Sequence, residues 1–254
     1  TITGAFAGGD EGVYAADTDL MNARFIFELV QNVDDCSYKT VDNCTLEIQF
    51  DIAANVIRLE YNELGFQPEN VIAITGLGNS TKNHSKARNI KSEKKIDQSD
   101  LQEIGEKGIG FKSIFGLAKR VKITSQYFCF TIDRDSFFVP VVDDYTNITY
   151  TDGTVLELTL DEGMLEELFD FLQRKYDNVE AIINENPILF LNKLTEIKYC
   201  KSQEEYFGFR VSRSNTIGEY TEENTIIEYF SSNTWKNKKI EAYRFSHTIE
   251  YSIE

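Results

Sequence analysis

Short segments in which apolar and polar residues alternate recur along the chain, and they constrain the fold more than any other feature. Thr45–Asp51 and Val56–Tyr61 both show this period of two and are separated by residues 52–55, which predicts a β-hairpin. Further strands are expected at VKITS (121–125), YFCFTID (127–133) and TVLELTL (154–160). These segments predict that a sheet forms the centre of the fold.

Helical periodicity is confined to a few segments. A helix is expected over about residues 19–36, and one or two more over 163–185, where leucine and phenylalanine recur at helical spacing. A glycine-rich turn at 105–119 is expected to open into a helix. Residues 206–254 return to a β pattern, so we predict one domain over 1–200 and the start of a second, β-rich unit over 201–254.

The composition is that of a globular protein, with 254 residues of which 41% are hydrophobic and 27% charged. The net charge of −16 argues against general binding to a nucleic-acid backbone, which requires clustered Lys and Arg. Four scattered cysteines and two histidines predict reduced thiols and no zinc site. No apolar run is long enough for a membrane span. We therefore expect a cytoplasmic or nuclear protein without a membrane partner.

The segment RFIFELVQNVDDC (24–36) carries a polar stripe along its predicted helix. Glu28, Asn32 and Asp35 are spaced i, i+4 and i+7, so they share one line on the helix surface beside an apolar arc. Such a stripe fits a half-buried cleft. It also fits the solvated face of an ordinary amphipathic helix.

The segment IGEKGIGFKSIF (104–115) places Gly105, Gly108 and Gly110 before an apolar helical pattern. Glycines at this place let backbone N–H groups approach an anion at the N-terminus of the helix. A flexible hinge explains the same glycines equally well. The spacing matches neither the P-loop nor the dinucleotide-binding fingerprint.

Two shorter segments carry candidate polar groups. Glu63 in YNELGF stands two residues before Gly65, where its carboxylate could accept a hydrogen bond from an exocyclic amine. Thr154 opens an apolar strand after Asp152 and Gly153. Taken singly, the first segment also fits a strand-ending turn, and the second is unremarkable.

The order of these four pieces resembles the GHKL ATPase superfamily, which includes gyrase B, the ninety-kilodalton heat-shock chaperone, histidine kinases and MutL. The motif sequences FELVQNVDD, NELGF and GEKGIGFKS are most similar to the corresponding motifs of sacsin and NO VEIN type proteins. The resemblance covers about Tyr14 to Leu160. It implies a Bergerat-type α+β fold, in which helices and a mixed, mostly antiparallel sheet form a two-layer α/β sandwich, followed here by a β-rich extension.

The resemblance also implies roles for individual residues. Glu28 matches the general base that activates water, Asn32 the Mg²⁺ ligand and Asp35 the motif carboxylate at the phosphate and ribose side. The usual second motif is Asp-x-Gly-x-Gly, so either Tyr61 or Glu63 takes the place of its Asp, and we prefer Glu63 as the adenine acceptor. The other implied ATP-binding residues are Gly65, Lys82, Gly105, Lys107, Gly108, Ile109, Gly110, Phe111 and Thr154.

The function expected from this resemblance is ATP binding and slow hydrolysis to ADP and phosphate. The basic segment 83–103 would be a lid that closes over the triphosphate, and residues 1–14 an arm that crosses to a second subunit on dimerisation. The parent would be a larger chaperone-like or regulatory protein with an unidentified client. The alternatives are a non-catalytic, nucleotide-gated interaction module, and the ATPase motor of a DNA- or chromatin-processing protein.

Overall fold

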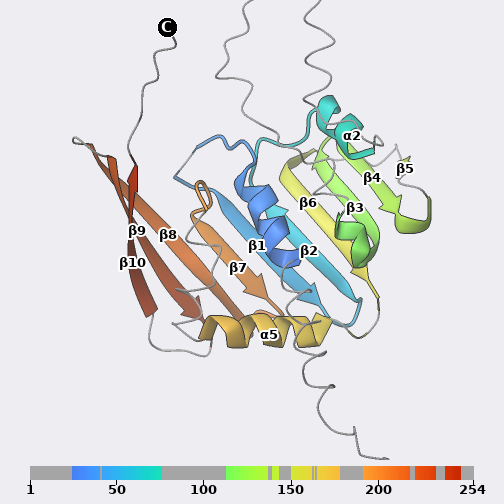
Figure 1. Cartoon of the computed structure of the whole chain (residues 1–254). Coiled ribbons are helices and arrows are strands. Elements are labelled where there is room, and N and C mark those ends of the chain that lie inside the picture. The colour runs from blue at the N-terminus through green and yellow to red at the C-terminus, as the bar shows by residue number, and fades with distance from the viewer. Residues whose placement is uncertain are drawn as a thin grey trace, which may run out of the picture.

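The strands of the chain assemble into one mixed sheet. The computed structural model describes residues 25–40, 42–75, 113–136, 139–142, 150–161, 163, 165–177, 191–217, 221–232 and 238–246. Its strands are β1 (Thr45–Asp51), β2 (Val56–Tyr61), β3 (Ala118–Gln126), β4 (Phe128–Asp133), β5 (Pro140–Val142), β6 (Thr151–Leu160), β7 (Glu196–Cys200), β8 (Tyr206–Ile217), β9 (Thr221–Ser231) and β10 (Lys238–Ser246). They form a ten-stranded sheet in the order β10-β9-β8-β7-β1-β2-β6-β3-β4-β5 (Figure 1).

Strand directions in this sheet are antiparallel except at one pair. β1 and β7 run parallel, with Thr45 opposite Glu196. The predicted hairpin is confirmed, because β1 and β2 pair antiparallel from Leu46 opposite Tyr61 to Asp51 opposite Val56. Parallel neighbours need a long connection, and here everything from β2 to α5 lies between β1 and β7 in the chain.

The two faces of the sheet differ in chemistry. In β1, Leu46, Ile48 and Phe50 are buried in the core, whereas the residues between them are half-buried. Oppositely charged residues pair across neighbouring strands, for example Arg210 with Glu196 at 2.9 Å, Arg120 with Asp133 at 2.6 Å and Lys198 with Glu47 at 3.5 Å. The period of two therefore gives the sheet one apolar face and one ionic face.

Helices cover part of the apolar face. The described α-helices span 25–34, α2 (Pro68–Thr75) and α5 (Leu165–Asp177), and short 3₁₀ turns form η1 (Ser113–Gly116) and η2 (Arg134–Ser136). Phe169 of α5 contacts Phe50 and Phe207, with ring centres 5.3 and 5.5 Å apart. In Figure 1 the 25–34 helix lies in front of β1 and β2, and α5 crosses one end of the strands. Within the described ranges, no α-helix combines the length and apolar character that crossing a bilayer requires.

The expectation of a two-layer α/β sandwich is wrong. The part of the chain that the structure describes is mainly β, with ten strands and only three α-helices. β8 pairs antiparallel with β7, β9 pairs antiparallel with β8, and β10 pairs antiparallel with β9. Because an open strand edge presents unpaired N–H and C=O groups, the alternating C-terminal segments extend the sheet. The predicted domain boundary near residue 200 stays a prediction.

Local structure near residue 116 also differs from expectation. Where a helix was predicted at the end of 105–119, the described residues form the 3₁₀ turn η1, and β3 already begins at Ala118. Ala118, Val121 and Ile123 are fully buried, so burial against the core outweighs the weak helical pattern of this segment. The predicted arm 1–14 and lid 83–103 lie outside the described residues.

Candidate functional site

A cavity of about 220 Å³ lies between the 25–34 helix, the segment after β2, and α2. Its walls are mainly apolar and include Leu29, Val33, Phe66, Ile74 and Leu156. A few polar groups interrupt this lining, among them Asn32, Glu63 and Asn70. An apolar pocket with a small number of placed polar groups is typical of a small-molecule binding site.

One face of the 25–34 helix, with the residue Cys36 just after it, forms one wall of the cavity. Leu29, Asn32, Val33 and Cys36 all line the cavity, and their spacing of three and four residues brings them to the same side of an α-helix. Asn32 is half-buried, whereas Leu29 and Val33 belong to the core. The helix therefore holds one amide side chain at the cavity within an otherwise apolar face.

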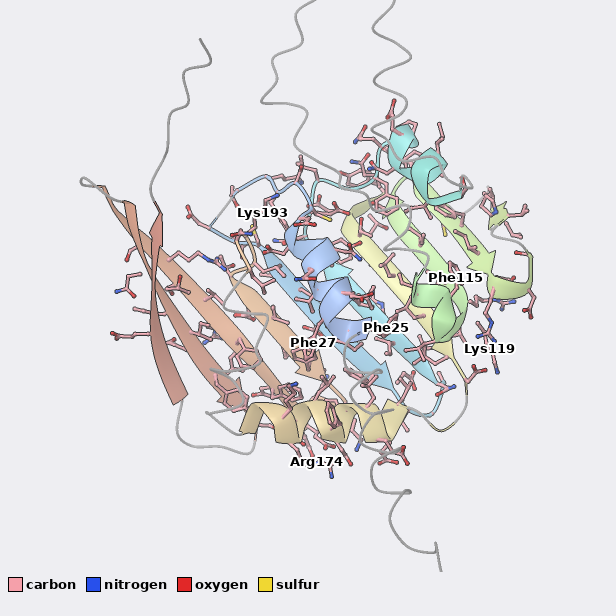
Figure 2. All side chains as sticks on the ribbon, in the orientation of Figure 1. Phe25, Phe27, Phe115, Lys119, Arg174 and Lys193 are labelled. Atoms are coloured by element: carbon pink, nitrogen blue, oxygen red, sulfur yellow. The ribbon has the colours of Figure 1, made fainter. Side chains whose placement is uncertain are left out.

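The C-terminal end of this helix is tied to the turn before β7. Asp34 is 3% exposed, and its carboxylate accepts hydrogen bonds from the backbone N–H groups of Asn192, Lys193 and Leu194, each at 2.8 Å. The Lys193 ammonium lies beside the end of the helix (Figure 2) and donates to the Cys36 carbonyl at 2.8 Å. A cation there satisfies a carbonyl that has no partner within the helix.

Three buried polar side chains from separate parts of the sheet form a chain of hydrogen bonds at the cavity wall. Glu63 follows β2, Thr154 lies in β6 and Ser125 near the end of β3. The Thr154 hydroxyl donates to Glu63 Oε1 at 2.7 Å, and Ser125 Oγ lies 2.6 Å from Thr154 Oγ1. Because buried polar groups are costly without partners, this chain helps to stabilise a carboxylate in an apolar wall.

Two phenols surround the same carboxylate. Tyr61 is buried and lines the cavity. Burial, with the nearby negative charge of Glu63, raises the pKa of the Tyr61 phenol well above its ordinary value. The Tyr38 hydroxyl donates to the Val33 carbonyl at 2.8 Å, and burial raises its pKa as well. Both phenols therefore remain neutral hydroxyls at physiological pH.

Two glycines shape turns at or near the cavity, and Gly65 is part of its lining. Gly65 has a φ of +85°, and a Cβ there would lie 2.6 Å from the Gln126 side chain. That side chain donates from Nε2 to the Leu64 carbonyl at 2.6 Å. Gly153 has a φ of +81°, and a Cβ there would overlap the Tyr61 carbonyl oxygen. Both positions need a residue without a Cβ.

Gly153→Ala is expected to lower the free energy of unfolding by about 3 kcal/mol, because it adds a clash with β2 backbone to an unfavourable φ. Gly163→Ala is the matched control, since Gly163 has a φ of +87° but a Cβ added there would meet no other atom within 4 Å. The control should lose only about 1 kcal/mol. Urea unfolding measures both, and equal losses would show that the contact with Tyr61 is unimportant.

The structure brings several of the predicted site residues together. Asn32, Glu63 and Gly65 line the cavity, and Thr154 is bonded to Glu63 behind the wall. The two residues considered for the Asp position of the second motif, Tyr61 and Glu63, both line it, but it is Glu63 that presents a carboxylate held by Thr154. The role of Glu63 as the adenine acceptor stays a prediction.

Two other predicted residues, Glu28 and Asp35, are described by the structure but do not line the cavity. Glu28 is half-buried one turn before Asn32, and Asp35 is exposed. The carboxylate next to it, Asp34, is the one that turns inward. Lys82, Gly105, Lys107, Gly108, Ile109, Gly110 and Phe111 lie outside the described residues. The roles given to all of these residues stay predictions.

Two buried polar side chains, Ser125 and Asp34, were missed by the sequence reasoning, and both carried a signal. Ser125 shares strand parity with Val121 and Ile123, so it is a polar residue on the apolar face of a strand. Asp34 stands four residues after Val30, which places a carboxylate within the apolar arc of the helix. In both cases a polar residue stands at a position where the periodicity of its strand or helix predicts a buried apolar residue.

No protein-family model matches the chain. The chain is similar to Protein NO VEIN of Arabidopsis thaliana. The two are 38% identical over 112 residues, which make up 44% of this chain and 4% of that protein. The match thus spans a small part of the length of its relative. It supports the expected relation to NO VEIN type proteins, while membership of the wider GHKL superfamily stays a prediction.

The described residues contain no group of three or more His, Cys, Asp or Glu side chains that could hold a metal ion. A Mg²⁺ ion that is shared with a triphosphate keeps several waters and takes one or two oxygen ligands from the protein. The amide of Asn32 at the cavity wall is of the type that can supply one such oxygen. Among the described residues of the cavity wall, Asn32 therefore fits the type of ligand that such an ion takes, and the role of Mg²⁺ stays a prediction.

Proposed function

We propose that this chain is an ATP-binding module related to the GHKL ATPases, and that it slowly hydrolyses ATP to ADP and phosphate. One observation carries the proposal. The Glu63 carboxylate is 7% exposed and is held by the Thr154 hydroxyl in the wall of an apolar cavity. A carboxylate in the wall of a mainly apolar cavity suits a ligand that is largely apolar and able to donate hydrogen bonds.

Adenine has these properties, because its faces are apolar and its exocyclic amine donates hydrogen bonds. The amine would bind the carboxylate of Glu63, and the ring would lie against apolar wall residues such as Val33 and Leu156. Hydrogen bonds to a charged group contribute more than neutral ones. Glu63 would therefore provide both the orientation of the base and a large share of the base's affinity.

The helix would serve the triphosphate. Asn32 lines the cavity, and Glu28 lies one turn earlier on the same stripe. In the proposal the Asn32 amide helps to hold Mg²⁺, which would neutralise phosphate charge, and the Glu28 carboxylate orients and polarises the attacking water. Closure of the predicted lid, dimerisation, and a role within a larger chaperone-like protein belong to the proposal as well.

Calorimetric titration of the 254-residue chain with a non-hydrolysable ATP analogue and Mg²⁺ tests the proposal. Glu63→Gln is expected to weaken binding about 10- to 100-fold, the equivalent of one hydrogen bond to a charged group. Glu69→Gln is the matched control, because Glu69 is exposed on α2 close to the cavity. That control should bind like the unchanged protein.

Two results would contradict the proposal. The unchanged chain could show no binding of the analogue at millimolar concentration. Alternatively, Glu63→Gln and Glu69→Gln could bind it equally well, which would remove the cavity from nucleotide recognition. Thermal unfolding of each variant confirms that the comparison is made between folded proteins.

A further inference from the structure

We propose that Arg213 of β8 is a positioning residue for nucleotide binding. It acts through the turn 191–194 before β7 on the 25–34 helix, and it thereby makes the C-terminal part of the sheet a support of the nucleotide site. The inference rests on the proposed nucleotide function. It adds a residue that sets the affinity of the cavity without being among the residues that line it.

Arg213 is a charged residue on the apolar face of β8. Phe207, Phe209 and Val211 are buried in the core, and Arg213 shares their strand parity. Its side chain is half-buried. A guanidinium at such a position needs hydrogen-bond partners, because removing an unpaired charge from water is costly. The partners of Arg213 therefore show which part of the fold it serves.

The guanidinium holds both ends of the turn 191–194. Arg213 Nη1 donates to the Leu194 carbonyl at 3.1 Å, and Nη2 donates to the Leu191 carbonyl at 2.9 Å. β8 lies beside β7 in the sheet (Figure 1), and the Val211 N–H donates to the Thr195 carbonyl at 2.8 Å. The fixed N–H directions of an arginine allow one side chain to bind two carbonyls at once.

The cavity helix holds the same turn through its amides. The Asp34 carboxylate accepts from three consecutive backbone N–H groups of the turn, each at 2.8 Å. The Lys193 ammonium of the turn donates to the Cys36 carbonyl at 2.8 Å. The turn is thus bonded to a cation of β8 through its carbonyls and to an anion of the helix through its amides.

This connection gives Arg213 an effect on the cavity. Without the guanidinium, the turn is held from the helix side alone, and the end of the helix loses its fixed place against the sheet. Asn32, Val33 and Cys36 lie at that end and line the cavity. A binding site requires its side chains to be held close to the productive geometry. Loss of Arg213 should therefore weaken nucleotide binding by the folded protein.

Titration with a non-hydrolysable ATP analogue and Mg²⁺ tests this role. Arg213→Ala is expected to weaken binding about tenfold. Arg213→Lys should weaken it less, since lysine keeps the charge but lacks the fork. Arg210→Ala is the matched control, because Arg210 is exposed on the opposite face of β8 and donates to Glu196. The control should bind like the unchanged chain, and thermal unfolding confirms that each variant is folded.

Hydrogen exchange followed by NMR supplies a readout that support of the fold alone would not change. Coupling between two sites is reciprocal, so saturation with the analogue should slow exchange of the Val211 N–H about tenfold in the unchanged chain and in Arg210→Ala. In saturated Arg213→Ala this slowing should be absent. A purely structural role would speed exchange equally with and without the analogue. If Arg213→Ala fails to fold, Arg213→Lys provides both comparisons.

The outcomes distinguish this inference from the proposed function. If the unchanged chain does not bind the analogue, both are overturned. If it binds the analogue but Arg213→Ala binds equally tightly, or if the variant keeps the slowing at Val211, only the role of Arg213 is overturned. Weaker binding and lost slowing in Arg213→Ala, with neither change in Arg210→Ala, support it.

Discussion

Replacing Asp34 with alanine is expected to lower the free energy of unfolding by about 4 kcal/mol. The carboxylate accepts three backbone hydrogen bonds from consecutive residues of the turn before β7. Each hydrogen bond to a charged group contributes roughly 1.5–3 kcal/mol, and a buried donor left unpaired costs roughly 1–3 kcal/mol. Water can reach part of the turn after the substitution, because Lys193 lies partly at the surface, so the full sum is not expected.

Urea unfolding measures this loss. Asp35→Ala is the matched control, since Asp35 is the next residue but is exposed, and surface substitutions of this kind usually change stability by less than about 0.5 kcal/mol. Asp34→Asn should fall between the two, because an amide keeps one acceptor oxygen and turns a donor toward the other N–H. Equal losses for Asp34→Ala and Asp35→Ala would show that the turn does not depend on this carboxylate.

Replacing Glu28 with alanine is expected to reduce ATP turnover by roughly 10²- to 10⁴-fold while ATP affinity changes little. The proposed function gives this carboxylate the task of orienting and polarising water. It lies one turn before Asn32 and outside the lining of the cavity, so its removal should leave the contacts to the base intact. Steady-state phosphate release and analogue titration measure the two quantities separately.

The control for this experiment is Gln31→Ala, because Gln31 is exposed on the same helix. It should turn over ATP at the rate of the unchanged chain. Turnover by Glu28→Ala within a few-fold of that rate would remove Glu28 from the mechanism. If Glu28→Ala lost both ATP affinity and ATP turnover to a large extent, Glu28 would instead act in nucleotide binding.

Local patterns explain which parts of the fold could be predicted. The hairpin of β1 and β2 was found with its boundaries, because alternation and a short connection depend only on neighbouring residues. β5 is three residues long, too short for any periodicity. β7 was not recognised, since its place in the sheet depends on parallel pairing with β1, far away in the chain. No local pattern in either strand specifies that partner.

The candidate site divides in the same way. Asn32, Glu63 and Thr154 were singled out from the sequence motifs of separate segments. The structure places Asn32 and Glu63 in the lining of one cavity, and Thr154 is hydrogen-bonded to Glu63 behind this lining. Ser125 was passed over, because a serine in a strand is common and only its hydrogen bonds with Phe66, Thr154 and Gly153 make it notable. Asp34 was passed over in favour of the neighbouring Asp35.

By itself, the sequence determined the period of most strands, the face of the helix that carries Asn32, and two of the polar residues that line the cavity, Asn32 and Glu63. These properties follow from spacing along a few turns or a few strand positions. Only the tertiary structure decided that β8 to β10 continue the sheet of β1. It also decided that Asp34 is buried and Asp35 exposed, and that Ser125 meets Thr154. Strand edges and burial are set by contacts between distant segments, and these contacts exist only once the chain has folded.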